Sequence, residues 1–238
     1  MNIKTANPFS AAIAAERGNG RAAVIPDIKC ISPKEGDLLR GRDPVQVATE
    51  LVSWGASVLS VVTENKHFGG SAKLLQTIVE STKVPVLRKD FIHDVAGLRE
   101  TVDLGASAVL LIAASMDEKT LAILYERACH LGLEPLVEVH TAEEMAFAKT
   151  LQPRLLGINN RNILDLERDS GNPERTEHLA KEKPAGTLLI SESGILSAND
   201  ARQAMRAGAD AVLIGTALWL AANMEVTYRE FQEAVCHV

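Results

Sequence analysis

The 238-residue chain is 46% hydrophobic but only 4% aromatic, so aliphatic side chains must fill its core, as they do in buried parallel strands. A formal net charge of −6 at pH 7, with no basic run, argues against nucleic-acid binding. The three cysteines form no C-x-x-C pair, and neither a signal peptide nor a membrane-length apolar run is visible, so we expect a reduced, cytoplasmic protein without membrane contact.

The first 21 residues predict a short helical extension ahead of the first strand. Phe9 and Ile13 would form an apolar side, and Glu16 and Arg17 would lie opposite them. Ser10 is the candidate N-cap of this helix, because a serine side chain can accept a hydrogen bond from the first helical turn.

Three glycines mark a repeat along the chain. An amphipathic helical segment ends at each of Gly55, Gly105 and Gly208, and an apolar strand starts two or three residues later. The repeat indicates an α/β protein. Open doubly wound sheets also produce it, so it does not by itself give the number of strands.

Counting the apolar strand patterns gives eight, which end near Lys29, Thr63, Lys89, Ala113, Val139, Asn159, Glu192 and Gly215. Helical patterns cover 44–54, 72–81, 95–104, 118–131, 142–149, 174–182 and 198–207, and a last one starts after Gly215. Eight such units in this length are what an α/β protein of the (β/α)8 or TIM barrel type requires. No linker divides the chain, so we predict one domain over residues 1–238, in which residues 1–21 are the extension.

Charged residues gather where the strands end. Period-two alternation places Lys29, Lys89, Glu138 and Glu192 on the inward face of their strands, with Asp27 and Asn159 beside them. Lysines next to carboxylates allow a proton donor and a proton acceptor to coexist near neutral pH. Such a set suits carbonyl activation followed by loss of water, although a salt-bridge network that closes the barrel would have the same composition.

A second cluster consists of small residues after the last two strands. Ser193-Gly194 and Gly215-Thr216 would let backbone N–H groups approach an anion ahead of a helix, which indicates phosphate binding. Tight turns that need glycine for geometry alone are the alternative. Ser32, after the first strand, could add to the same site.

The remaining candidates for chemistry give little. The six histidines show no metal-ligand spacing and are expected on the surface or in loops, with His140 at a helix entry beside Glu143 and Glu144. Cys30 faces away from Lys29 by alternation and is expected to pack as a small hydrophobe.

These strand-end motifs resemble the indole-3-glycerol-phosphate synthases of tryptophan biosynthesis, over about residues 25–218. The resemblance rests on Ile28-Lys29 with Ser32-Pro33, Thr63-Glu64 with Phe68-x-Gly70-Ser71, Leu87-Arg88-Lys89-Asp90-Phe91, Leu136-Val137-Glu138-Val139-His140, Gly157-Ile158-Asn159-Asn160-Arg161-Asn162 and Ser191-Glu192-Ser193-Gly194-Ile195. It implies a lyase that closes the ring of 1-(2-carboxyphenylamino)-1-deoxyribulose 5-phosphate, with loss of carbon dioxide and water and without cofactor or metal.

The resemblance also implies roles for individual residues. Lys89 would be the general acid that protonates the substrate carbonyl, and Glu138 the acid/base group of the dehydration. Lys29 and Asn159 would position substrate and assist proton transfer, and Asp27 and Glu192 would complete the catalytic pocket. The substrate- and phosphate-binding residues would be Ser32, Phe91, Arg161, Ser193, Gly194, Gly215 and Thr216.

Two features differ from the family pattern. Asp27 stands where the family usually has glutamate, and a misplacement of about 1 Å can cost about a hundredfold in rate. The family also usually has a longer N-terminal extension that helps to cover the substrate. A paralogue with altered substrate or weak activity is therefore an alternative, as is a non-catalytic relative that binds a phosphorylated ligand and acts by partner contact.

A phosphosugar isomerase on the same barrel, such as a phosphoribosylanthranilate isomerase, is a further alternative. Ile28-Lys29-Cys30 resembles the first strand of that family, but Asn159 stands where an acid would be expected. For all of these we expect a small phosphorylated substrate or ligand and a monomer or weak homo-oligomer.

Overall fold

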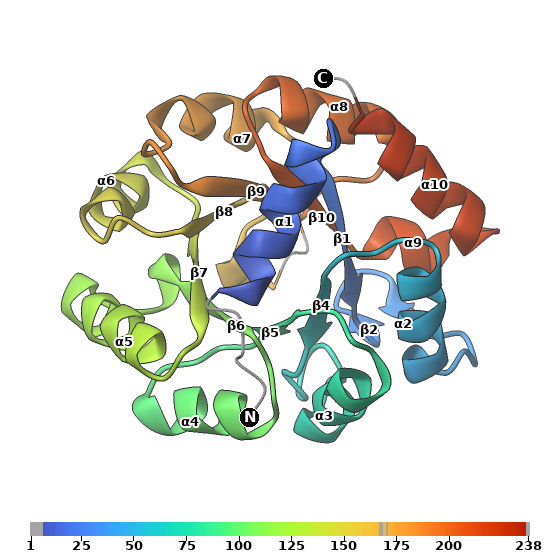
Figure 1. The fold of residues 1–238 in the computed structure, drawn as a ribbon, viewed down its shortest axis with the longest axis horizontal. Coiled ribbons are helices and arrows are strands. Elements are labelled where there is room, and N and C mark those ends of the chain that lie inside the picture. The colour runs from blue at the N-terminus through green and yellow to red at the C-terminus, as the bar shows by residue number, and fades with distance from the viewer. Residues whose placement is uncertain (1–6, 167–168, 170, 237–238) are drawn as a thin grey trace.

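Eight parallel strands close into a barrel in the computed structural model, which describes residues 7–166, 169 and 171–236 (Figure 1). In order around the barrel they are β1 (Ala23–Ile28), β4 (Leu59–Val62), β5 (Val86–Lys89), β6 (Ala108–Ile112), β7 (Glu134–Val139), β8 (Leu155–Asn159), β9 (Leu188–Glu192) and β10 (Ala211–Ile214). β10 pairs with β1 in parallel and closes the ring. The predicted (β/α)8 barrel is confirmed.

Helices surround the barrel and connect its strands (Figure 1). They are α2 (Pro44–Ser53), α3 (Ala72–Ser81), α4 (Val95–Asp103), α5 (Glu118–His130), α6 (Ala142–Thr150), α7 (Glu174–Leu179), α8 (Ala198–Arg206), α9 (Thr216–Leu220) and α10 (Met224–Ala234). Short 3-10 turns lie at η1 (Ala113–Ser115), η2 (Ile163–Asp165) and η3 (Ala180–Glu182), and a small hairpin, β2 (Ile31–Ser32) with β3 (Gly36–Asp37), follows β1. The helix predicted after Gly215 is thus two helices, α9 and α10.

Polar caps fix where most of these helices begin. The side chains of Asp43, Ser71, Asp94, Asp117, Thr141, Ser197 and Asn223 each accept a hydrogen bond from a backbone N–H group in the first turn. Such caps satisfy donors that have no partner within the helix.

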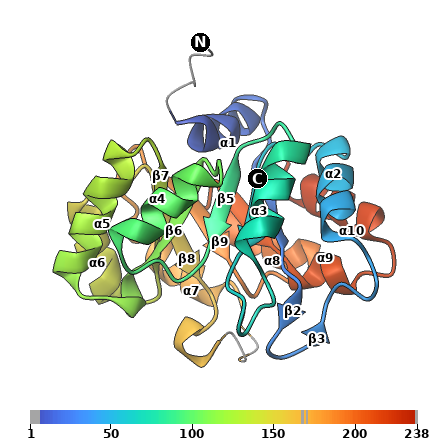
Figure 2. The same ribbon diagram turned by 90° about the horizontal axis from the view of Figure 1, so that it is seen from below.

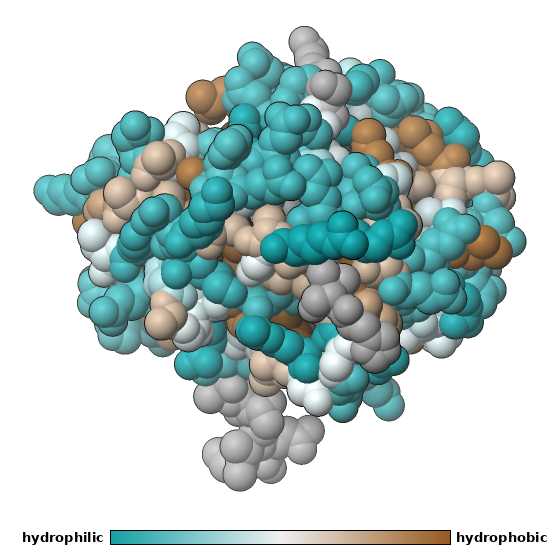
Figure 3. All heavy atoms as spheres, turned by 90° about the horizontal axis from the view of Figure 1, so that it is seen from above, coloured by the Kyte–Doolittle hydropathy of each residue, from teal (hydrophilic) through white to brown (hydrophobic). Residues whose placement is uncertain are grey.

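The outer surface seen in Figure 3 is mainly hydrophilic, with apolar side chains scattered over it.

Alternation along the strands separates two apolar layers. Inward-facing residues form one buried cluster, which includes Ile25, Leu87, Leu110, Leu136 and Leu155. Outward-facing residues such as Val61 and Val137 instead pack under the helices. The barrel interior is therefore a packed core and not a pore.

Helix α1 (Pro8–Gly18) lies across the N-terminal end of the barrel, while the β2–β3 hairpin lies at the other end (Figures 1 and 2). Phe9 and Ile13 are fully buried in the same cluster as the barrel interior. The buried carboxylate of Glu134, at the start of β7, accepts hydrogen bonds from Phe9 N at 2.6 Å and Ser10 N at 3.1 Å. The extension therefore plugs the barrel.

The predicted N-cap of this helix is wrong. Asn7 occupies the cap position, and Ser10 lies inside the first turn, where it is buried. The reason is tertiary: Glu134, 124 residues away from Ser10, accepts from the N–H groups that a capping side chain would otherwise serve.

Candidate active site

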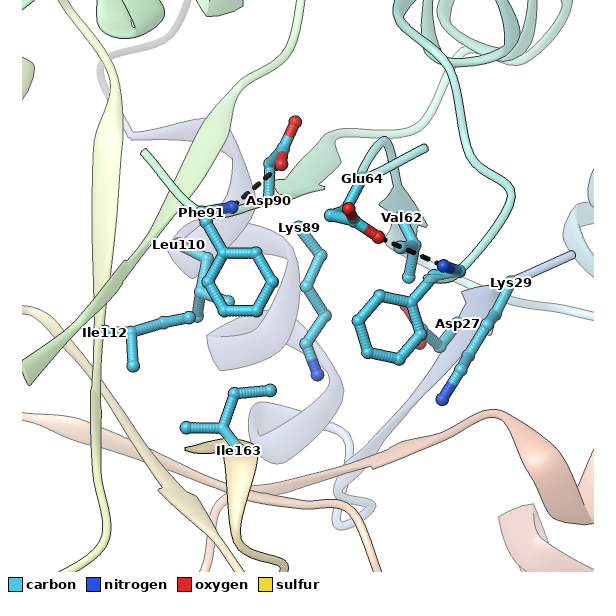
Figure 4. A pocket seen from close by; sticks show the side chains of 11 residues that line it. Asp27, Lys29, Val62, Glu64, Lys89, Asp90, Phe91, Leu110, Ile112 and Ile163 are labelled. Atoms are coloured by element: carbon cyan, nitrogen blue, oxygen red, sulfur yellow. Dashed lines mark hydrogen bonds between the residues drawn. The ribbon is translucent and has the colours of Figure 1, made fainter. Parts of the chain in front are cut away.

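The carboxyl ends of the strands surround a cavity that is open to solvent on one side (Figure 4). It is lined by Asp27, Lys29, Val62, Glu64, Phe68, Lys89, Asp90, Phe91, Leu110, Ile112 and Ile163. Two aromatic rings and several aliphatic side chains make most of its wall. We call this cavity the apolar half of the site.

A second cavity adjoins the first. It is lined by Asp27, Lys29, Lys89, Arg161, Ser193, Gly194, Ile195, Leu196, Leu213, Gly215 and Thr216. We call it the small-residue half. Asp27, Lys29 and Lys89 line both halves, so these charged residues lie at the junction between an apolar chamber and a chamber edged by small residues.

Lys89 ends β5 and extends through the apolar half (Figure 4). Its Nζ lies 3.5 Å from Glu192 Oε2, and both side chains are buried. Arg88, the preceding residue, points the other way, where it bonds Thr63 and pairs with Glu100 at 2.8 Å. Alternation thus places the amine of Lys89, and not the guanidinium of Arg88, at the mouth of the barrel, where the strands end.

The two inward glutamates are fully buried, and a glycine makes room for one of them. A Cβ on Gly157 would overlap Oε1 of Glu192, so only glycine fits beside that carboxylate. In the strand register Gly157 lies next to Glu138, and Asn159 lies next to Glu192. Asn159 Oδ1 accepts a hydrogen bond from Arg161 N at 2.9 Å, which fixes the amide.

Asp27 is held by β4, by α9 and by the glycine between β10 and α9. Ser60 Oγ of β4 donates to Asp27 Oδ1 at 2.6 Å, and Trp219 Nε1 of α9 donates to Asp27 O at 2.8 Å. Gly215 packs against the same residue, since a Cβ there would lie 3.3 Å from Asp27 Cβ. This carboxylate is therefore fixed at the wall that separates the two halves.

Lys29 lies over an aromatic ring from the loop after β4. Its Nζ is 4.7 Å from the centroid of Phe68, within range of a cation–π contact. The loop is held by Glu64, whose carboxylate accepts from the N–H groups of Lys66, His67 and Phe68.

Cys30, which follows Lys29 in the chain, is buried. Burial together with the charge of Asp37 raises the pKa of its thiol, which makes it a poor nucleophile.

The small-residue half is built by a turn that needs unusual backbone. Ser193 and Gly194 both have positive φ, 58° and 67°, and a Cβ on Gly194 would lie 3.0 Å from the backbone of Gly171. Asn160 Nδ2 holds the turn by donating to the carbonyls of Glu192 at 2.9 Å and Ser193 at 3.1 Å. Thr216 begins α9, which has only five residues.

Four predicted residues do not line either half: Glu138, Asn159 and Glu192 are buried behind the lining residues, and Ser32 lies in the hairpin after β1. Ser32 is buried there, and its hydroxyl accepts from Lys34 N and Glu35 N. Phe91 and Arg161 do line the site, one in each half.

Residue-level reasoning missed part of the apolar wall. Leu110 and Ile112 could have been found, because they share the inward face of one strand. Phe68 and Glu64 lie in a loop, where no periodicity indicates which side chains turn inward. Among the described residues no group of His, Cys, Asp and Glu could hold a metal ion, and no helix is long and apolar enough to cross a membrane.

Comparison with known proteins agrees with the motifs. The model of the family described as indole-3-glycerol phosphate synthase matches residues 2–231. The chain is 44% identical over 211 residues to the indole-3-glycerol phosphate synthase of Pyrococcus furiosus, covering 89% of this chain and 92% of that protein. It is 38% identical over 213 residues to the synthase of Halalkalibacterium halodurans, covering 89% and 82% of the two chains.

A solved structure supports the fold alone. The thiamine phosphate pyrophosphorylase of Pyrococcus furiosus superimposes with a TM-score of 0.67, over 90% of this chain and 95% of that one, at 16% identity. The predictions of a lyase and of a role in tryptophan biosynthesis are confirmed by the family match and by the named relatives. With 44% identity across nearly its whole length, this chain belongs to the indole-3-glycerol phosphate synthase family.

Proposed function

We propose that this chain closes the ring of 1-(2-carboxyphenylamino)-1-deoxyribulose 5-phosphate to give indole-3-glycerol phosphate, carbon dioxide and water, using the charged residues that join the two halves of the site. The observation that carries this assignment is the shape of the site. An apolar chamber and a chamber edged by Ser193, Gly194 and Gly215 meet at Asp27, Lys29 and Lys89. The substrate has a matching order: an aromatic ring, a reacting carbonyl and a phosphate.

The aromatic ring belongs in the apolar half, between the rings of Phe68 and Phe91 and the aliphatic side chain of Ile163. Burying a ring there gains free energy from apolar area, about 25 cal/mol per Å². The phosphate belongs in the small-residue half, where glycine backbone at Gly194 and Gly215 permits close approach and Arg161 supplies a positive charge. These two ends fix the carbonyl near Lys89.

Lys89 protonates the carbonyl oxygen as the ring carbon attacks the carbonyl carbon. A new carbon–carbon bond forms, the C=O π electrons become an alcohol that carries the lysine proton, and loss of carbon dioxide restores the aromatic ring. Glu192, 3.5 Å from Lys89 Nζ, holds the amine in its charged, proton-donating form.

Glu138 serves the dehydration that follows. It donates a proton to the departing hydroxyl, and the proton that the new five-membered ring loses regenerates the acid. Lys29, placed by Phe68, and Asn159, placed by Arg161 N, orient the intermediate and assist these transfers. Asp27, bonded to Ser60, keeps a negative charge beside the two lysines.

The test is a direct turnover assay on the wild type and Asp27→Glu in parallel. Purified protein and substrate should give the fluorescence of an indole product, and Asp27→Glu should change the rate by up to about a hundredfold, because the carboxylate is kept but moved by one methylene. No indole signal from the wild type at high enzyme concentration would overturn the proposal. If the wild type binds the ligand without turnover and Asp27→Glu restores turnover, the result would favour a non-catalytic relative instead.

The isomerase alternative is separated by the products. An aminoaldose that is converted without release of carbon dioxide would support it, and Lys89 and Glu138 would then be idle. We propose further that the protein works in the cytoplasm as a monomer or weak homo-oligomer. Sedimentation of the purified chain at several concentrations tests the assembly.

A further inference from the structure

His140 lies in the loop between β7 and α6, and its side chain is turned inward, toward Glu138. It follows β7, two residues after Glu138, and its side chain is only 8% exposed. Its Nε2 lies 3.5 Å from Glu138 Oε1, and its Nδ1 lies 3.4 Å from Glu144 Oε2. The imidazole is therefore inserted between two carboxylates.

Glu144 is a fixed member of this group. It lies in the first turn of α6, and Thr141 caps that helix by accepting from Glu144 N. Its Oε2 also accepts from His140 N at 2.7 Å. Burial raises the pKa of the Glu144 carboxyl. The hydrogen bonds and charge of His140 lower it by a larger amount together, so the pKa is below its usual value and the group is ionised at neutral pH.

An ionised Glu144 fixes which ring nitrogen carries a proton. Its carboxylate can only accept, so Nδ1 of His140 must donate to it. A neutral imidazole would then turn the lone pair of Nε2 toward Glu138 Oε1, and two acceptors would face each other. One proton between Nε2 and Oε1 removes that conflict. The two atoms lie at ion-pair distance, and a shift of about 0.6 Å would bring them to the distance of an ordinary N–H···O hydrogen bond.

Other charged groups also face His140, from the segment after β8 and from α7. Asp169, Glu174, Arg175 and His178 line a cavity with it. Arg175 is engaged elsewhere, since its Nη1 donates to the carbonyls of Asn159 at 2.6 Å and Arg161 at 2.8 Å. Glu138 and Glu144 are the carboxylates that contact the imidazole directly.

We propose that His140 is a positioning residue for Glu138: it shares one proton with that carboxylate, and Glu144 sets its tautomer. This inference rests on the proposed role of Glu138. The proton is conserved over each turnover. The departing hydroxyl takes the shared proton and leaves as water, and the proton that the ring then loses restores the pair, so His140 and Glu138 hold one proton before and after each turnover.

The proposal is tested with His140→Gln, Glu144→Gln and the matched control Glu143→Gln, which changes the neighbouring exposed residue of the same helical turn. Single-turnover rates and KM are measured across pH 5–10 with the full-length protein, so that product release does not mask the chemistry. The wild-type pair should keep its proton to a higher pH than an isolated carboxyl would, because imidazole takes part in holding it.

His140→Gln should lower the single-turnover rate by about 10- to 100-fold with little change in KM, and the alkaline limb of the pH profile should move to lower pH. Glu144→Gln should shift that limb the same way by less, and Glu143→Gln should overlay the wild type. A merely structural role would lower thermal stability and leave the pH profile unchanged. If His140→Gln does not fold, His140→Asn and Glu144→Gln carry the test.

A His140→Gln profile that superimposes on the wild type would overturn the proposal while wild-type turnover still supported the proposed function. If the wild type itself gave no turnover, the proposed function would fail first. The two failures are therefore distinguishable.

Discussion

The two ends of the barrel use the same strands for opposite purposes. At the N-terminal end, α1 inserts Phe9 and Ile13 into the interior, and the buried carboxylate of Glu134 accepts from N–H groups of the helix. At the C-terminal end the interior positions carry Asp27, Lys29, Lys89, Glu138 and Glu192. One end is closed by apolar packing, and the other keeps two joined cavities.

This difference shows how one architecture can separate stability from chemistry. A buried charge is favourable at the plug because its partners are fixed backbone donors. At the mouth, buried amines and carboxylates lie close together around space for a substrate, which costs stability and gains reactivity. Substitutions at the plug should therefore affect folding, and substitutions at the mouth should affect catalysis.

The largest effect is expected at the mouth. Lys89→Ala removes the proposed general acid and should lower kcat/KM by about 10²- to 10⁴-fold. Its melting temperature should also fall, because the buried carboxylate of Glu192 loses the amine 3.5 Å away. Steady-state kinetics measure kcat/KM, and thermal denaturation measures the melting temperature. A variant that keeps the full rate would remove Lys89 from the mechanism.

The plug should respond differently. Phe9→Ala deletes a fully buried ring and should lower the free energy of unfolding by about 3–5 kcal/mol. Well below its melting temperature the variant should keep the wild-type kcat, since α1 and the site lie at opposite ends. Urea denaturation measures the free energy of unfolding, and kinetics at low temperature measure kcat. A large loss of kcat without loss of stability would contradict the separation of folding and catalysis between the two ends.

Gly157→Ala tests how closely the mouth is packed. The added methyl group would overlap Glu192 Oε1, so the carboxylate must leave its position beside Lys89 Nζ, and kcat should fall about 100-fold. Gly18→Ala is the matched control, because nothing lies within 4 Å of a Cβ at that position in α1. Equal activity of the two variants would show that the position of Glu192 is unimportant.

The smallest effect is expected from the plug's own charge. Glu134→Gln keeps the shape and one acceptor oxygen but removes the charge that faces the first turn of α1, and should cost about 1–2 kcal/mol of unfolding free energy. The activity should not change. High salt should narrow the gap between variant and wild type only slightly, because the carboxylate is buried.

Much of the barrel could be predicted because its signals are local. The glycine repeat marks the helix-to-strand joints, and alternation places Lys89 inside and Arg88 outside. The features that sequence reasoning missed depend on distant partners. Asn7 replaces Ser10 as N-cap because of Glu134, and the side chain of His140 is covered because α6 brings Glu144 against it. The extent of the predicted single domain and the roles of the site residues stay predictions.

The most direct test of the account compares two products in one reaction. Wild-type protein is mixed with 1-(2-carboxyphenylamino)-1-deoxyribulose 5-phosphate, and carbon dioxide and indole product are quantified together. If the charged residues at the junction perform the ring closure, the two appear in equal amounts and both are abolished by Lys89→Ala. Carbon dioxide without indole, neither product, or indole at an undiminished rate from Lys89→Ala would contradict it.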